Sequence, residues 1–198
     1  MRILVGPAHW GGTTHKLQLI EVAKALARRG HEAHYVTDEP APAGPFPVGF
    51  VVRVATEVAW PADLELELGV RWLSEPAPTL RLELAAAALQ ASRTFLTSAL
   101  VSTTFGGLSF DFAVVDAGSL AGHLLVEKLR IRHVHYLSYP PAPPASAEER
   151  AAEVALASRS VTPELHRLRA EFGIPPKHEV AALHELTLVG HSRALQTE

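Results

Sequence analysis

The chain begins MRILVGPAHWGGTTHKLQLIEVAKALARRGHEAHYVT (residues 1–37), and this stretch decides the fold. A short apolar run at residues 3–5 leads through a glycine-rich turn into residues 16–29, whose apolar side chains recur at the three- and four-residue spacing of an amphipathic helix. Gly30 suits the left-handed conformation that ends many helices, and Ala33–Thr37 reads as a second strand. Strand, helix and strand together predict a βαβ unit, and therefore a parallel sheet with a right-handed crossover.

The same alternation continues along the chain. Prolines at 40, 42, 45 and 47 predict a loop over residues 38–48, and residues 55–78 read as an irregular connection. The further elements that we predict are strands at Gly49–Val54, Phe112–Val115, Val134–Leu137 and Leu186–Val189, and helices at 79–101, Leu120–Leu129, 146–157 and 162–171. This order predicts an α/β fold with a doubly wound, mostly parallel, Rossmann-like sheet in a single domain over residues 1–198.

Composition narrows the classes of partner. The 198 residues, 47% of them hydrophobic, are enough for one sizeable core. A formal net charge of −3 gives no basic patch for nucleic acid or for an anionic membrane surface, so we expect a small-molecule partner, no nucleic acid and no membrane. The chain has no cysteine, which excludes disulfides, thiolate metal sites and cysteine nucleophiles.

Targeting signals are not evident in the sequence. Only Arg2 precedes the apolar residues 3–5, which are too few for the core of a signal peptide. No apolar run approaches the roughly 20 residues that span a bilayer. We therefore expect a soluble, cytoplasmic protein.

The first turn nearly matches two nucleotide-binding patterns but satisfies neither. Gly6 and Gly11 have the spacing of a P-loop and Thr13 follows, but Gly12 stands where the lysine that reaches the phosphates must be. Pro7 also removes a backbone N–H that a phosphate cradle would use. The dinucleotide pattern G-x-G-x-x-G is absent, so the turn gives no support for an NTPase or for a nicotinamide or flavin cofactor.

Two residues could form a catalytic dyad. His15 lies at the helix entrance, where the positive end of the helix dipole favours a neutral imidazole that can accept a proton. Asp116 lies at the carboxyl end of a later strand, and in an open parallel sheet these ends converge on one crevice. Together they would place a carboxylate on the imidazole N–H and fix its tautomer. The alternatives are an exposed histidine at a helix start and an aspartate that caps a turn, and the spacing does not show that the side chains meet.

Two other candidates are weaker. Ser119 lies in a strand–turn–helix context, but Ala117 and Ala121 replace both glycines of the nucleophile-elbow pattern G-x-S-x-G. His133 and His135 form a close alternating pair without a carboxylate, which is more typical of histidines in a core or on a sheet surface than of a metal site.

The chain resembles the N-terminal, acceptor-binding half of the two-domain (GT-B) glycosyltransferases, close to the UDP-glucuronosyltransferase and UDP-glucosyltransferase family. Residues 12–15, the helix after them and residues 29–31 resemble the family's glycine-and-histidine loop, its helix and the turn that follows. Residues 110–117 resemble the family's strand that ends in an aspartate. Segments 165–169, 173–176 and 186–192 resemble parts of the same domain, whereas residues 38–108 match only in the order of elements. Thr14 departs from the family, which has glycine before its histidine.

The resemblance implies an inverting transfer from a UDP-sugar to a hydroxyl of a small lipophilic acceptor. His15 would be the catalytic base and Asp116 its partner, with no metal and no cofactor bound to this domain alone. The acceptor would contact Trp10, Gly12 and Thr13 in the first turn, and Trp60, Trp72 and Phe105 in the variable middle of the chain. For the last three residues, ordinary core packing is an equal alternative.

The family's donor-binding domain has no counterpart in this sequence. We therefore expect a C-terminal donor-binding domain or subunit as a partner, and no sugar transfer by this chain alone. The alternative is a non-catalytic small-molecule binding protein that is derived from the same domain.

Overall fold

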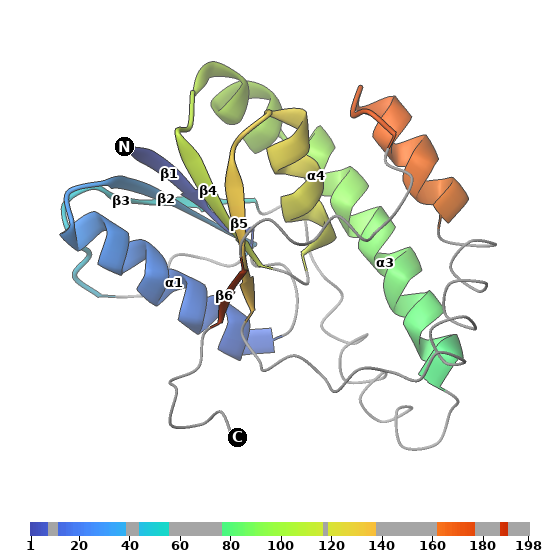
Figure 1. Cartoon of the computed structure of the whole chain (residues 1–198), viewed down its shortest axis with the longest axis horizontal. Coiled ribbons are helices and arrows are strands. Elements are labelled where there is room, and N and C mark those ends of the chain that lie inside the picture. Colours follow the sequence, from blue (N-terminus) through green and yellow to red (C-terminus); the bar gives the residue numbers. More distant parts are fainter. Residues whose placement is uncertain are drawn as a thin grey trace.

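The computed structural model of the chain describes residues 1–7, 12–38, 44–55, 77–116, 119–137, 162–176 and 187–189. For residues 12–15, 77–82, 84, 137 and 187–189 it describes the backbone alone. The described strands form one six-stranded sheet in the order β3-β2-β1-β4-β5-β6, and every pairing is parallel (Figure 1). The strands are β1 (Arg2–Val5), β2 (Glu32–Thr37), β3 (Phe50–Val54), β4 (Phe112–Asp116), β5 (His133–Leu137) and β6 (Thr187–Val189). The doubly wound Rossmann-like sheet predicted from the sequence is confirmed, and its order reverses between β1 and β4.

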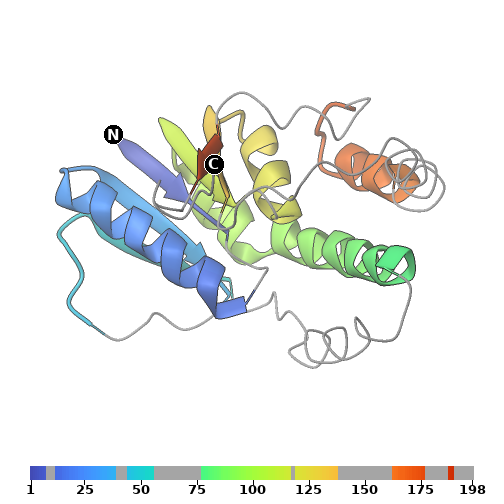
Figure 2. The same ribbon diagram turned by 60° about the horizontal axis from the view of Figure 1, so that its bottom comes forward.

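Helices cover both faces of the sheet. Helix α1 (Gly12–Arg28) lies on one face, and α3 (Ala77–Thr97) and α4 (Leu120–Lys128) lie on the other (Figure 2). A further helix at 162–171 lies beside α3, to which it is tied by an ion pair between Arg93 Nε and Glu171 Oε2 at 3.1 Å. Arg169 adds a tie to α4, since its guanidinium lies 2.6 Å from Glu127 Oε2.

The alternation of side chains along β1 explains why two cores form. Ile3 and Val5 pack with Leu19 and Ile20 of α1, whereas Leu4 packs with residues of α3 and α4 on the opposite face. All three β1 side chains are at most 2% exposed. Burying side chains of this size contributes about 1.5–3 kcal/mol each, so a continuous apolar run is stable only in the middle of such a sheet.

Most predicted elements agree with the structure to within a few residues, and three need comment. Helix α1 starts at Gly12 rather than at residue 16. The helix predicted over 79–101 starts at Ala77 and ends at Thr97, and it is followed by a π-helical turn at Leu100–Thr104 and a 3₁₀ turn at Phe105–Gly107. The helix predicted at 146–157 lies outside the described residues.

The early end of α3 has a physical cause. Near this end the Thr94 hydroxyl donates to the carbonyl of Gln90 and the Thr97 hydroxyl to that of Arg93, at 3.2 and 3.0 Å. Such side-chain bonds compete with the regular backbone ladder and bend helices. At the end of α1, by contrast, Gly30 has φ +83° and its N–H bonds the Ala27 carbonyl at 2.9 Å, as predicted for a helix-ending glycine.

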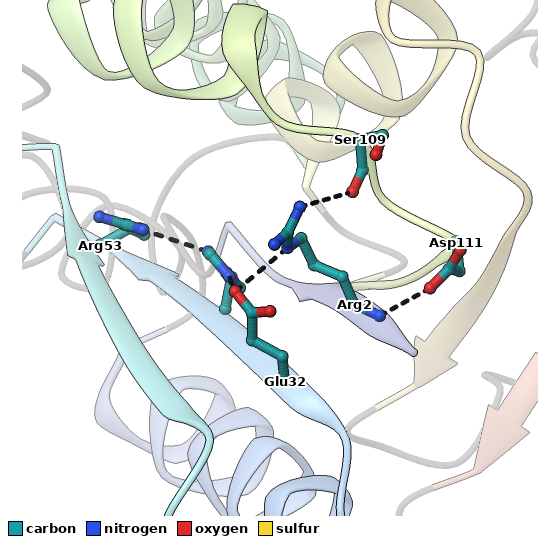
Figure 3. Close-up of polar contacts among 6 residues, drawn as sticks. Arg2, Glu32, Arg53, Ser109 and Asp111 are labelled. Atoms are coloured by element: carbon teal, nitrogen blue, oxygen red, sulfur yellow. Dashed lines mark hydrogen bonds and ion pairs between the residues drawn. The ribbon is translucent and has the colours of Figure 1, made fainter.

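A polar network lies at the amino edge of the sheet (Figure 3). Arg2 Nε donates to Glu32 Oε1 at 3.1 Å, and the same oxygen lies 2.7 Å from His34 Nε2. Arg53 Nε donates to His34 Nδ1 at 3.3 Å, and the Arg2 backbone N–H donates to Asp111 at 2.7 Å. Because arginine can only donate, the buried imidazole is neutral, with its proton on Nε2 toward Glu32. Its burial lowers the pKa of His34, although the hydrogen bond with Glu32 acts against this.

We expect His34 to make the protein less stable in mild acid. A histidine whose pKa is lowered on folding gives its full contribution above its ordinary value of 6.5, and this contribution is lost as the pH falls through the lower folded value. Urea unfolding from pH 7 to pH 5 should show a falling free energy of unfolding, and His34→Gln should remove part of this slope. If His34→Gln shows the same dependence of the free energy of unfolding on pH as the native chain, His34 is not the group that titrates. Glu32, whose pKa the Arg2 and His34 hydrogen bonds lower to about 2, loses its contribution only below its ordinary 4.5.

Candidate functional site

The reversal of strand order defines one edge of the sheet as the candidate site. β1 and β4 are neighbours, and the helices that follow them, α1 and α4, lie on opposite faces. The Gly6 N–H bonds the Val114 carbonyl at 2.9 Å and so extends the pairing beyond β1. In open parallel sheets a ligand binds at the carboxyl ends of the strands where the connections diverge.

Asp116 lies at this edge as the last residue of β4, and it is only 2% exposed. It follows Val114 by two residues, so it lies on the face of the sheet that α1 covers. Its register partner on β5 is Tyr136, which packs in the core beneath α1. The Tyr136 hydroxyl donates to Gln18 Oε1 of α1 at 3.1 Å, which ties β5 to the first half of this helix.

The pairing of Asp116 with Tyr136 affects the acidity of the phenol. Burial raises the pKa of the Tyr136 phenol above its ordinary value, and the negative charge of Asp116 raises it further. The phenol therefore stays neutral near pH 7 and can donate its proton to Gln18. The carboxyl edge of β4 and β5 thus carries two buried polar side chains, Asp116 and Tyr136.

A second contact fixes the start of α1. Lys16 Nζ lies 3.0 Å from Asp38 Oδ1, immediately after β2, with both side chains largely buried at 16% and 8% exposure. The Tyr35 hydroxyl donates to the Lys16 carbonyl at 3.2 Å. The first turns of α1 are thus held against the carboxyl ends of β2 and β5.

The structure describes some of the predicted acceptor and base residues and leaves others outside its described part. Gly12, Thr13 and His15 form the first turn of α1, and their side chains lie outside the described ones. The sequence analysis places a glycine-rich turn before residue 16, and this is corrected from Gly12 onward, because residues 12–15 are helical. Three other predicted residues, Trp10, Trp60 and Trp72, lie outside the described part of the chain.

Phe105 requires a correction. It is 1% exposed, belongs to the core beneath α3 and α4, and its ring meets Phe110 edge-on at 5.7 Å between centroids. It also precedes β4, so it lies toward the amino edge of the sheet, away from Asp116. Core packing, the alternative in the sequence analysis, describes this residue, and an acceptor-pocket wall does not.

Ser119 is a helix cap. It is fully buried and accepts a hydrogen bond from the Gly122 N–H at 3.1 Å, which satisfies one of the donors at the start of α4. This role accounts for the hydroxyl without nucleophilic chemistry, in line with the mismatch to the nucleophile-elbow pattern.

Gly122 holds the start of α4 close to the candidate site. A Cβ at this position would meet Val115 Cγ1 at 2.6 Å and Pro7 Cδ at 3.2 Å. We expect Gly122→Ala to destabilise the fold by about 1–3 kcal/mol, the usual cost of overpacking. Gly107→Ala is the matched control, since its Cβ would meet nothing within 4 Å. Urea unfolding of both variants checks this, and equal stabilities would show that α4 moves away freely.

Sequence reasoning missed Gln18, Tyr136, Lys16 and Asp38. One signal was available for Gln18, which follows His15 by three residues and so shares its side of the helix. Tyr136 is 118 residues from Gln18 in the chain, and no local pattern predicts this contact.

Among the described helices, none is both long and apolar enough to cross a membrane.

No protein-family model and no curated protein sequence matches the chain. Solved structures of glycosyltransferases do match it. The glycosyltransferase VinC in complex with DTDP gives a TM-score of 0.53 at 18% identity, over 96% of this chain and 48% of VinC. Spinosyn rhamnosyltransferase SpnG, complexed with thymidine diphosphate, gives 0.58 at 21% identity, over 96% of this chain and 45% of SpnG. The chain thus spans about half the length of these enzymes and has the Rossmann-like fold of one GT-B half.

Proposed function

We propose that this chain is the acceptor-binding half of an inverting glycosyltransferase, which moves a sugar from a nucleotide sugar to a hydroxyl of a small lipophilic acceptor. The observation that carries the proposal is the buried Asp116 at the carboxyl edge of β4, on the face covered by α1, whose first turn contains His15. The fold shared with VinC and SpnG supports it.

The position of His15 on α1 supports its pairing with Asp116. His15 precedes Gln18 and Leu19 by three and four residues, so the three positions share one side of the helix. Leu19 is fully buried against the sheet, and Gln18 bonds Tyr136, the register partner of Asp116. We therefore propose that the His15 side chain, on the same side of the helix, faces the end of β4.

In the proposed reaction the neutral imidazole of His15 takes the proton of the acceptor hydroxyl. The hydroxyl oxygen then bonds to the anomeric carbon as the bond to the nucleoside diphosphate breaks, and the configuration inverts. Asp116 accepts the other imidazole N–H, fixes the tautomer and stabilises the positive charge that the ring gains. The start of α1 favours a neutral ring before the reaction.

The donor is proposed to be a nucleoside-diphosphate sugar that a second domain or subunit holds. The resemblance in sequence favours UDP-sugars, whereas the VinC and SpnG structures contain thymidine diphosphate, so donors of both kinds belong in the test. The acceptor site is proposed to include Trp10, Gly12 and Thr13, with Trp60 and Trp72 as apolar walls.

The test is a transfer assay with UDP-glucose and dTDP-glucose and a panel of lipophilic phenols and alcohols. We expect no product from the 198-residue chain alone, and product of inverted configuration when a donor-binding domain, encoded in frame with it or beside it, is added. Product from the chain alone would refute the requirement for a second domain. Binding of an acceptor without transfer in either assay would favour the alternative, a non-catalytic small-molecule binding protein.

A further inference from the structure

Three histidines meet on the face of the sheet that α4 covers. His133 and His135 alternate along β5 and so point to the same side, and His123 comes from α4. The ring centroid of His135 lies 4.7 Å from that of His123 and 5.1 Å from that of His133. One nitrogen of each ring can be chosen so that all three lie within 4.8 Å of one another.

This spacing suits a tetrahedral metal ion after a small closure. Zinc–nitrogen bonds of about 2.0–2.1 Å place the ligand nitrogens of a tetrahedral site about 3.3 Å apart. Metal binding therefore requires the imidazoles to rotate about their side-chain torsions until the nitrogens, now within 4.8 Å of one another, approach this separation. His123 and His133 are partly exposed, which gives an ion a path of entry, whereas His135 is only 5% exposed.

The surroundings already orient one ligand. His133 Nδ1 lies 3.1 Å from the Ile131 carbonyl oxygen, which can only accept a hydrogen bond. Nδ1 therefore carries the ring proton, and Nε2 keeps its lone pair for a metal. A backbone carbonyl on the second nitrogen is the arrangement that fixes metal-binding histidines in proteins.

We propose that His123, His133 and His135 bind a divalent transition-metal ion of the zinc class. Three neutral nitrogen donors favour Zn²⁺, Ni²⁺ or Co²⁺ and offer little to Mg²⁺ or Ca²⁺, which prefer oxygen ligands. The ion holds α4 against β5, because His123 belongs to the helix and the other two ligands to the strand. Tyr136 points to the opposite face of the sheet, so this site is separate from the proposed transfer chemistry and does not depend on it.

The test is a calorimetric titration of the untagged full chain with Zn²⁺, with Mg²⁺ as the ion control. The chain has eleven histidines, and any of them can bind zinc. The assignment of the site to these three histidines therefore depends on the comparison between variants. We expect one site whose affinity is unchanged in His166→Ala and falls by more than about 10–100-fold in His123→Ala, because loss of a group that only orients a ligand already has an effect of that size. His166 is an exposed histidine on the helix 162–171 and serves as the matched control.

A second measurement guards against misfolding of the variants. Co²⁺ bound to nitrogen ligands in a tetrahedral site absorbs visible light, and circular dichroism reports whether the fold is intact. We expect the cobalt absorption in the native chain and in His166→Ala, and its loss in folded His123→Ala. Equal zinc affinity in His123→Ala and the native chain, or no site in the native chain that Zn²⁺ fills and Mg²⁺ does not, would overturn the proposal.

Discussion

Alanine in place of His15 is expected to lower sugar transfer by the assembled enzyme about a hundred- to ten-thousand-fold, the range that a positioned general base contributes. The acceptor hydroxyl is a weak nucleophile while it keeps its proton, and without the imidazole only water can take that proton. The loss should fall on kcat far more than on KM, because the base acts on the reacting proton and contributes little to holding the acceptor. Initial rates at several acceptor concentrations separate the two constants.

His31→Ala is the control for this variant. His31 follows the other end of α1, and its backbone N–H bonds the Leu26 carbonyl at 3.2 Å, at the edge of the sheet opposite to Asp116. This variant should transfer sugar at close to the native rate. Turnover by His15→Ala within a few-fold of the native enzyme would remove His15 from the mechanism, and a rise in KM alone would give it a binding role.

The fold was predictable because its signals are local. The apolar run of β1, the periodic helix after it and the helix-ending Gly30 each follow from neighbouring residues, and the connection between parallel strands is right-handed by general rule. The strands therefore agreed to within a residue or two, and the place of Asp116 at the end of β4 followed from the same pattern.

The contacts that support the site were not predictable in the same way. Gln18 and Tyr136 meet only because α1 crosses over the sheet and brings its first turns to β5. His123 joins His133 and His135 only because α4 packs on the face to which both strand residues point. The polar chain from Arg2 through Glu32 and His34 likewise depends on the register of β1 against β2. Register and helix placement are tertiary properties, and spacing in the sequence does not encode them directly.

Phe105 is a residue that the sequence assigned to the acceptor site and that the structure places in the core. An aromatic residue in a variable segment suits a pocket wall as well as a core, and only the path of the chain decides between them. The turns after α3 lead Phe105 toward the start of β4, where its ring packs against Phe110. This buried position is that of a core residue.

Asp116→Asn is the second variant for which we expect a large effect, because Asp116 is proposed to fix the tautomer of His15. Asparagine keeps the shape of the side chain, but its amide can present an N–H to the imidazole, which then holds its proton on the nitrogen that should act as the base. In serine proteases the equivalent change lowers kcat about ten-thousand-fold, and we expect a loss of similar order in sugar transfer by the assembled enzyme. Transfer within tenfold of the native rate would separate Asp116 from the proposed base.

Tyr136 gives a readout of the same variant that needs no activity. The charge of Asp116 contributes to the raised pKa of the Tyr136 phenol, so Asp116→Asn should lower this pKa while burial keeps it above the ordinary value. Ultraviolet titration can follow it in a Tyr35→Phe, Tyr139→Phe background, since the chain has three tyrosines. A lowered pKa together with lost transfer is what an ionised Asp116 beside the base requires. An unchanged pKa would mean that no negative charge of Asp116 acts on this phenol, and it would contradict the placement of the carboxylate beside Tyr136.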